Sequence, residues 1–286
     1  MSNLASEKVT ATPNPNTLRK ILQQIPQQPA RRQAELILAK VTHTSLTQIY
    51  THPETSLTPA QFQKFQKIFQ AQQRGQPLAQ IFGEQEFFGL NLHLSPDVLI
   101  PRPETEILVT KIIQANPQSL LEIGTGSGCI ALAVKKNCPH CQILATDIAP
   151  SALKIARQNA RRLKLSVTFQ QSDLLAQIPA TNKFSLVAAN LPYISLGSPA
   201  LSPTVRKFEN PLALFGGRDG LTLIKRLLTE IAQRPNFCQK ILLEIGFDQK
   251  APLTAYLKKI WPKAKINFTQ DLAQIPRVCE IILKTK

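Results

Sequence analysis

The stretch LLEIGTGSGCI, residues 120–130, decides the fold class of this chain. An apolar run ends at three alternating glycines, Gly124, Gly126 and Gly128, and a helical pattern follows them. Glycines in a strand-to-helix turn let the backbone approach a ligand closely and adopt conformations that other residues avoid. The spacing is G-x-G-x-G, whereas dinucleotide-binding folds use G-x-G-x-x-G around a pyrophosphate. The turn therefore predicts a cofactor loop whose ligand need not carry a pyrophosphate.

Strand-like and helix-like segments alternate along the chain around this turn. Strands are predicted at residues 119–124, 142–147, 166–173, 184–190 and 238–246, and helices at 128–137, 150–163 and 220–233. Such alternation predicts an α/β fold, with a mostly parallel sheet and helices on both of its faces. Ligands of these folds bind beyond the carboxyl ends of the strands. The motifs described below all lie at such ends.

Acidic residues follow two of the strands after the glycine turn. Asp147 ends the strand at 142–147, where a carboxylate can accept hydrogen bonds from both hydroxyls of a ribose. Asp173, in QQSDLL, follows the next strand and is well placed for an adenine amino group. A tight turn with a surface acid explains either feature alone. Together they favour a nucleoside ligand, and S-adenosylmethionine fits better than NAD because of the glycine spacing and the motif after the fourth strand.

That motif is VAANLPYIS, residues 187–195, which leaves the strand with an asparagine, a proline and a tyrosine. Pro192 pushes Leu191 into an extended conformation, which turns its carbonyl outward. This carbonyl and the side-chain oxygen of Asn190 can accept the two N–H bonds of one planar NH₂ group. Tyr193 can stack on the flat face of the same group. An ordinary strand-exit turn would also produce such a tetrapeptide by chance.

The predicted chemistry is the transfer of a methyl group to an amide or aromatic amine. The lone pair of such a nitrogen is delocalised, and acceptors on both hydrogens stabilise the positive charge that develops there. A sulfonium methyl is already activated, so alignment at ~3–3.5 Å is the main requirement. No histidine lies in the motif, and the mechanism needs neither a metal nor a dedicated strong base.

The chain before residue 102 is predicted to form smaller parts. Residues 1–16 form a polar tail, and residues 17–80 form a helical domain with apolar residues three and four apart. Its last helix begins at Thr58 and Pro59 and ends at Gly75. Residues 81–101 alternate around Gly89 and predict a β-hairpin linker to the main domain, residues 102–286.

The net charge of the chain is strongly positive. It has 34 Lys and Arg residues against 18 Asp and Glu residues, which gives +16. Such a surface attracts RNA, the ribosome or an acidic protein, although a general basic bias explains it equally well. No apolar run approaches the ~18 residues of a membrane span. We expect a cytoplasmic monomer without a membrane segment, and a weak contact with RNA or the ribosome.

The five cysteines include a C-P-H-C motif formed by Cys138 and Cys141. A redox dithiol would open a helix after a strand, whereas this motif closes a predicted helix and precedes a strand. A structural zinc site would need two more ligands at close spacing, and the other cysteines stand alone. Reduced cysteines without a shared function are the better interpretation.

With these motifs in hand, the chain resembles the release factor glutamine methyltransferases, the HemK-like family, from about residue 17 to residue 284. The resemblance rests on the pieces ARRQAELILAKV, RGQPLAQIFGEQEFFGL, IPRPETE, LEIGTGSG, NLPYIS, FENPLALFGGRDGL, LLEIGFDQ and DLAQIPRV. IPRPETE and the last three pieces are more specific to the family than the general methyltransferase signatures.

The resemblance implies a Rossmann-like, seven-stranded class I methyltransferase domain and a small helical domain that helps to dock a release factor. It implies methyl transfer from S-adenosylmethionine to the side-chain nitrogen of the glutamine in a Gly-Gly-Gln loop. Two groups of residues carry over by position. The cofactor would contact Gly124, Thr125, Gly126, Ser127, Gly128, Asp147, Asp173, Leu174 and Asn190, and the glutamine amide would contact Asn190, Leu191, Pro192 and Tyr193.

Two positions depart from the family pattern. Leu191 stands where the family usually has proline, which keeps the backbone carbonyl but gives up some rigidity. Leu174 stands where relatives often carry an aromatic residue beside the adenine. The roles of four further residues stay open between lining the site and bracing loops, with bracing preferred: Arg102, Glu104, Glu244 and Arg277.

Two other functions compete with this interpretation. NLPY is also similar to the signature of adenine dimethyltransferases, and with the +16 charge it suggests an RNA or DNA adenine N6-methyltransferase. Adenine must leave its stack to react, which calls for aromatic stacking, and the chain has only 3 Tyr and 1 Trp. A non-catalytic protein that binds RNA or the ribosome is the third candidate.

Overall fold

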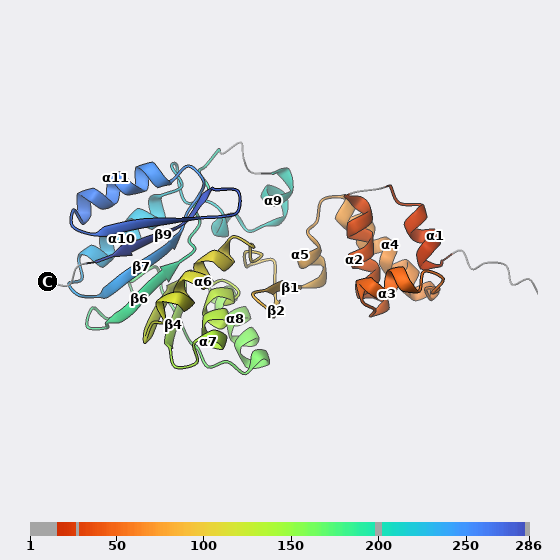
Figure 1. Cartoon of the computed structure of the whole chain (residues 1–286), viewed down its shortest axis with the longest axis horizontal. Helices are drawn as coiled ribbons and strands as arrows, with labels where there is room; N and C mark the ends of the chain where they lie inside the picture. The colour runs from red at the N-terminus through yellow and green to blue at the C-terminus, as the bar shows by residue number, and fades with distance from the viewer. Residues whose placement is uncertain (1–15, 27–28, 198–201, 284–286) are drawn as a thin grey trace, which may run out of the picture. The chain divides into compact units, whose positions relative to one another are not determined.

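The computed structural model describes residues 16–26, 29–197 and 202–283. The described residues fall into two compact units, one that ends at Ile81 and one that begins at Phe82 (Figure 1). The predicted tail at residues 1–16 lies almost wholly outside the described residues. Within the described ranges, no helix is long and apolar enough to cross a bilayer.

The first unit consists of helices, as predicted. They are α1 (Leu18–Gln23), α2 (Ala30–Thr42), α3 (Leu46–Thr51), α4 (Pro59–Gln73) and α5 (Leu78–Phe82). Thr58 caps α4: its side chain accepts from the Gln61 N–H, and the Gln61 side chain accepts from the Thr58 N–H. Gly75, at φ 90°, ends the helix, and its N–H donates to the Gln72 carbonyl. The predicted start and end of α4 are confirmed.

A β-hairpin follows, formed by β1 (Glu84–Phe87) and β2 (Leu90–His93). Its two turn residues, Phe88 and Gly89, both have positive φ, which suits the twist of a two-residue hairpin. The inward-facing Phe87 and Leu90 pack into the same hydrophobic cluster as the helices of the second unit. The hairpin predicted around Gly89 is present, and it belongs structurally to the second unit.

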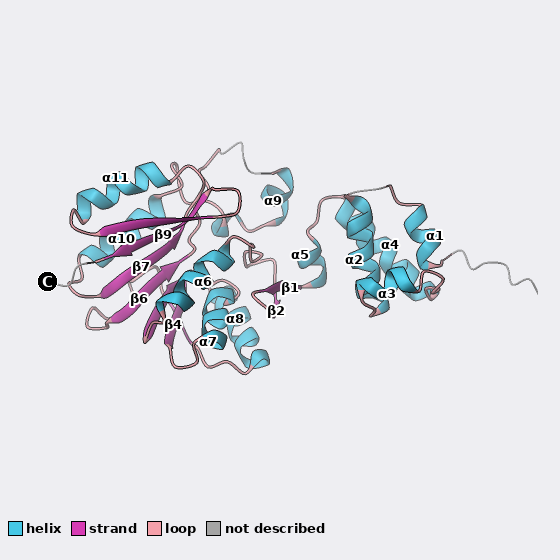
Figure 2. Ribbon diagram, in the orientation of Figure 1, coloured by secondary structure: helices cyan, strands magenta, loops and turns pink. Residues whose placement is uncertain are grey.

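The second unit is built on a seven-stranded sheet (Figure 2). Its strands are β3 (Ser119–Ile123), β4 (Gln142–Asp147), β5 (Thr168–Gln171), β6 (Phe184–Ala189), β7 (Cys238–Glu244), β8 (Lys265–Gln270) and β9 (Pro276–Ile282). The order is β5-β4-β3-β6-β7-β9-β8, with β9 antiparallel to both of its neighbours and the other pairs parallel. The predicted α/β class with a mostly parallel sheet is confirmed.

The helices of this unit are α6 (Thr105–Ala115), α7 (Cys129–Asn137), α8 (Pro150–Leu163), α9 (Pro203–Phe208), α10 (Thr222–Ala232) and α11 (Lys250–Ile260), with a 3-10 turn, η1 (Pro211–Ala213). Alternate strand residues enter two separate hydrophobic clusters, because successive side chains point to opposite faces of a sheet. Leu121 and Val187 join the cluster under α10 and α11, whereas Leu120 and Leu186 join the one under α6 and α7. Each face of the sheet is therefore covered by helices.

All five cysteines are free thiols. Cys138 and Cys141 lie between the end of α7 and the start of β4, as predicted, and both are buried. Burial raises the pKa of the Cys141 thiol to about 11. A thiol with a raised pKa is a poor nucleophile at neutral pH, and both cysteines pack in a hydrophobic cluster.

Candidate active site

The glycine loop leaves β3 and is held against the end of β4. The Gly124 and Thr125 N–H groups both donate to the Thr146 carbonyl, each at 2.8 Å. The Gly126 N–H donates to Oδ2 of Asp147 at 2.9 Å. The ends of these two neighbouring strands are thus joined through the loop, and the loop has a defined shape.

The three glycines of the loop share a positive φ but differ in what surrounds them. All three have positive φ, at 77°, 55° and 82° for Gly124, Gly126 and Gly128. A Cβ at Gly128 would lie 3.2 Å from both Ala156 and Leu132, so this glycine lets α7 and α8 approach each other. A Cβ at Gly126 would meet nothing within 4 Å, so this side of the loop is open to a ligand.

Asp147 is the acid predicted to hold a ribose. Its Oδ2 accepts from Gly126, and its Oδ1 accepts from the Ala149 N–H at 2.9 Å. Burial raises the pKa of Asp147, and these backbone donors counteract part of that rise. A carboxylate oxygen has two lone pairs, so each oxygen can accept one more hydrogen bond.

A second acid beneath the loop was not singled out by the sequence. Glu122 is fully buried in β3, its Oε2 accepts from the Thr125 hydroxyl at 2.9 Å, and burial raises its pKa to about 8. Its Oε1 and the Ser127 hydroxyl are buried with no partner among the described residues. Buried polar atoms without a partner are rare. Together with the open side at Gly126, they fit a loop that binds a polar cofactor.

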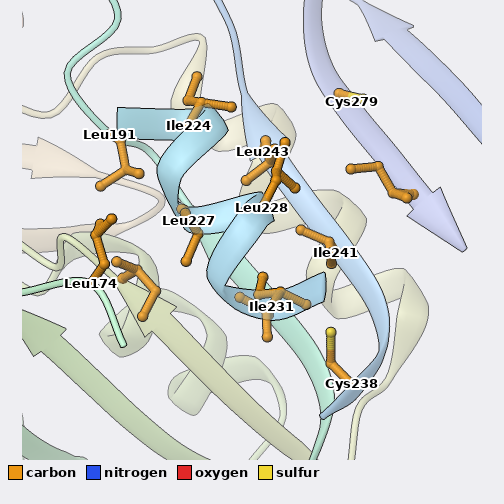
Figure 3. Close-up of a cluster of buried hydrophobic side chains, with 14 of the residues drawn as sticks. Leu174, Leu191, Ile224, Leu227, Leu228, Ile231, Cys238, Ile241, Leu243 and Cys279 are labelled. Carbon is orange, nitrogen blue, oxygen red and sulfur yellow. The ribbon is translucent and has the colours of Figure 1, made fainter. Parts of the chain in front are cut away.

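Asp173 and Leu174 follow β5. The Asp173 carboxylate forms an ion pair with Arg226 of α10, at 2.9 Å between Oδ2 and Nη2. Leu174 has a positive φ of 47° and only 5% exposure. Figure 3 shows its side chain in the hydrophobic cluster under α10, together with Leu191 and Leu227. Both residues predicted for the adenine side therefore also contact the protein itself.

The turn after β6 contains the asparagine predicted to hold the substrate amide. Nδ2 of Asn190 donates to the Thr105 hydroxyl, at the start of α6, at 3.1 Å. Within the described residues, no donor is bonded to Oδ1 of Asn190. The carboxamide is therefore anchored through its nitrogen, and its oxygen is left as an acceptor.

Leu191 links the turn to the cofactor loop. Its side chain is 5% exposed and lies in the cluster with Leu174. A Cβ at Gly124 would lie 3.1 Å from Cδ2 of Leu191, so the two segments are in close contact. The sequence suggested a loss of rigidity at Leu191. The structure shows that buried packing holds this residue.

Tyr193 is fixed at both ends. Its hydroxyl donates to Oε1 of Glu244, at the end of β7, at 3.2 Å, and its carbonyl accepts from Nε2 of Gln249 at 2.9 Å. Oε1 of Gln249 in turn accepts from the Gly246 N–H. Burial is the main cause that raises the pKa of the Tyr193 phenol. The tyrosine is therefore neutral and held in one place.

The FGGRDGL segment packs directly on the backbone of the same turn. A Cβ at Gly216 would lie 2.2 Å from the Pro192 carbonyl oxygen, and one at Gly220 would lie 2.2 Å from the Tyr193 carbonyl oxygen. The Ile194 N–H donates to the Leu214 carbonyl, and the Gly216 N–H donates to the Ile194 carbonyl. These glycines are needed because no side chain fits between the two backbones. This contact is long-range, and no local sequence pattern predicts it.

Ion pairs brace the segments around the turn. Arg102, from IPRPETE, pairs with the buried carboxylate of Glu209, from FENPLALF. Arg277 pairs with Asp271 at 2.8 Å, across the turn between β8 and β9. Both arginines hold loops together, in agreement with the bracing role preferred from the sequence.

Comparison with known proteins agrees with this architecture. A family model described as Methyltransferase small domain matches residues 103–203, and one described as PrmC N-terminal domain matches residues 16–83. The release factor glutamine methyltransferase of Koribacter versatilis is 36% identical over 253 residues, covering 87% of this chain and 89% of the relative. The enzyme of the same name from Escherichia coli is 34% identical over 223 residues, covering 77% and 80%.

One solved structure is similar over its whole length. A methyltransferase from Pyrococcus furiosus superposes with a TM-score of 0.55 at 20% identity, covering 76% of this chain and 100% of that chain. At this identity the likeness concerns the fold.

Proposed function

Because this chain belongs to the release factor glutamine methyltransferases, we propose that its turn at residues 190–193 holds a glutamine amide while S-adenosylmethionine, on the glycine loop, donates the methyl group. The enzyme methylates the side-chain nitrogen of the glutamine in the Gly-Gly-Gln motif of a peptide chain release factor. The anchored Asn190 carboxamide is the observation that carries the proposed role of the turn, because its nitrogen is bonded to Thr105 and its oxygen is left as an acceptor.

Two acceptors on the turn hold the substrate nitrogen. Oδ1 of Asn190 and the Leu191 carbonyl each accept one N–H of the glutamine amide, and the Tyr193 ring packs on its flat face. The positive charge that develops on the nitrogen is stabilised by these two oxygens, which are already oriented before the reaction. When bound, S-adenosylmethionine would supply the methyl group to this nitrogen, and its sulfur would keep the electron pair of the broken carbon–sulfur bond. The methylated amide then loses one proton to water.

The glycine loop and the acids beside it bind the cofactor. S-adenosylmethionine supplies a sulfonium methyl, which is activated for displacement. Asp147 would accept the ribose hydroxyls, and the backbone at Gly124, Gly126 and Gly128, with Thr125 and Ser127, would contact the rest of the nucleoside and the methionine part. On the adenine side, Asp173 keeps one carboxylate oxygen outside its ion pair with Arg226, and Leu174 covers the ring.

The helical unit that ends at Ile81 is proposed to dock the release factor. It supplies none of the residues assigned to the cofactor or to the amide. This agrees with a role in binding the substrate protein rather than in the chemistry.

The decisive experiment is methyl transfer from labelled S-adenosylmethionine to a purified release factor. A release factor with Asn in place of the Gln of its Gly-Gly-Gln motif and ribosomal RNA serve as parallel acceptors. We expect label on the first protein and on neither of the others. Label on RNA instead would favour the adenine methyltransferase, and label on the Asn variant would refute the proposed acceptor atom.

A further inference from the structure

A buried carboxyl group contacts the turn at residues 190–193, which is called the substrate turn below. Glu244, at the end of β7, is 1% exposed, and its Oε1 accepts from the Tyr193 hydroxyl. Its Oε2 has no partner at full hydrogen-bond geometry among the described residues. The charged groups that act on it are Glu104 and Arg277, which have opposite signs. Nothing in the transfer reaction itself uses this carboxyl group.

Thr105 connects Glu244 to the substrate turn. Its hydroxyl is buried at 1% exposure and accepts from Nδ2 of Asn190. The same side chain lies near the Glu244 carboxyl, and hydrogen bonding from it would lower the pKa of that carboxyl. A hydroxyl has one proton to donate and two lone pairs to accept with. When the Thr105 proton points to Glu244, only the lone pairs are left for Asn190.

We propose that Glu244, through Thr105 and the Tyr193 hydroxyl, is a positioning residue that orients the Asn190 carboxamide and the Tyr193 ring for the substrate. With the Thr105 oxygen as an acceptor, Asn190 must present its NH₂ to Thr105 and its Oδ1 to the substrate. This inference rests on the proposed function, because the required orientation is defined by the two N–H bonds of a glutamine amide.

The protonation of Glu244 decides the direction of this hydrogen-bond chain. As a carboxylate, Glu244 accepts from Tyr193, and its second oxygen is able to accept from Thr105. As a carboxylic acid it can donate to Thr105, whose proton then turns to Asn190 and favours the flipped carboxamide. A flipped Asn190 would present NH₂ to the NH₂ of the substrate, where an acceptor is required. Burial raises the pKa of Glu244 to about 7, so the working form is present above that pH and is lost below it.

The first test removes the hydroxyl of Thr105. Thr105→Val should lower kcat by about a hundredfold, the loss expected when a reacting group is misplaced, with the Kd of S-adenosylmethionine from calorimetry and the melting temperature little changed. Thr105→Ser should restore most of the rate. Thr110→Val is the matched control, since Thr110 lies on the same helix with its hydroxyl on a backbone carbonyl at the surface. An unchanged kcat in Thr105→Val, or a failure of Thr105→Ser to rescue it, overturns the proposal.

The second test follows pH. The kcat of the wild type should rise through about pH 7, and the rise should be absent in Glu244→Gln, whose side chain does not ionise. Glu280→Gln, on the adjacent strand β9, should keep the wild-type profile. An identical pH profile in Glu244→Gln and wild type overturns the proposal.

A third measurement does not depend on the substrate. In full-length protein labelled with ¹⁵N-asparagine, the side-chain NH₂ signal of Asn190, assigned with Asn190→Ala, should shift with pH around 7 and stay constant in Glu244→Gln. A signal that does not move in the wild type refutes the orienting role even if release factor is methylated. A moving signal without methylation of release factor supports the orienting role and refutes the proposed substrate.

Discussion

Asn190 is the residue on which the proposed reaction depends most directly, because it would supply one of the two acceptors for the substrate amide. Asn190→Ala removes that acceptor, while the packing of Leu191 and the hydrogen bonds of Tyr193 still hold the turn. We expect kcat to fall by about two to three orders of magnitude, as when one preorganised polar group is removed from a reacting centre, while the Kd of S-adenosylmethionine stays close to that of the wild type. Initial rates and calorimetry measure the two effects separately. A parallel loss of cofactor binding would contradict the assigned role.

Leu191 acts through packing as well as through its carbonyl. Leu191→Ala opens a cavity beside Leu174 and next to Gly124, and should lower the free energy of unfolding by about 2–5 kcal/mol and the rate of methyl transfer with it. Leu228→Ala is the control. Leu228 is fully buried in the same cluster, and its truncation removes the same number of atoms away from the turn. Denaturant unfolding should show similar losses for both variants, and rate assays a loss for Leu191→Ala alone. Equal rates would mean that Leu191 serves stability only.

At the scale of elements, the segment from η1 to α10 is a brace for the substrate turn. Gly220→Ala would place a methyl group 2.2 Å from the Tyr193 carbonyl oxygen, so the backbone of the turn must move. We expect a large loss of methyl transfer together with a lower melting temperature. Gly89→Ala is the matched control, because it has a similar φ of 68° but nothing within 4 Å. Its activity should stay near that of the wild type, and an equal loss in both variants would point to backbone strain instead of the clash.

The elements that the sequence predicted are those with strong local patterns. The strands from β3 to β7 and the helices α7, α8 and α10 follow from alternation and apolar spacing. The strands β8 and β9 were not predicted from the residues, because β8 is only partly buried and Pro276 begins β9. Helix α11 was not predicted from the residues, because only two of its residues are buried and its apolar pattern is weak.

The residues of the site also fall into those with a local sequence pattern and those without one. The glycine loop, Asp147 and the turn at 190–193 carry local signatures that can be recognised in sequence. Thr105, Gln249 and the glycines at 216 and 220 act through contacts with residues far away in the chain. Their positions could be assigned only once the topology had brought α6, β7 and the FGGRDGL segment to the end of β6.

At the scale of the whole molecule, the division into two units allows the proposed docking role of the helical unit to be tested apart from the chemistry. A shortened chain that begins at Gln76 keeps both hydrophobic clusters, the sheet and every residue assigned to the site. Its affinity for S-adenosylmethionine and its rate on a short Gly-Gly-Gln peptide should match those of the full chain. Its KM for intact release factor should rise. An unchanged KM for the intact protein would show that the helical unit does not dock it.

The bracing of the substrate turn also has a consequence for how the enzyme is made. The ribosome completes the cofactor loop and the turn at residues 190–193 well before it adds Gly216, Gly220, Glu244 and Gln249, and a chain emerges with its N-terminal part first. A nascent or prematurely ended chain that stops before these residues has the signature motifs but no support behind the turn. We therefore expect competence to methylate only after these residues have been added, and we expect chains that stop before them to be inactive.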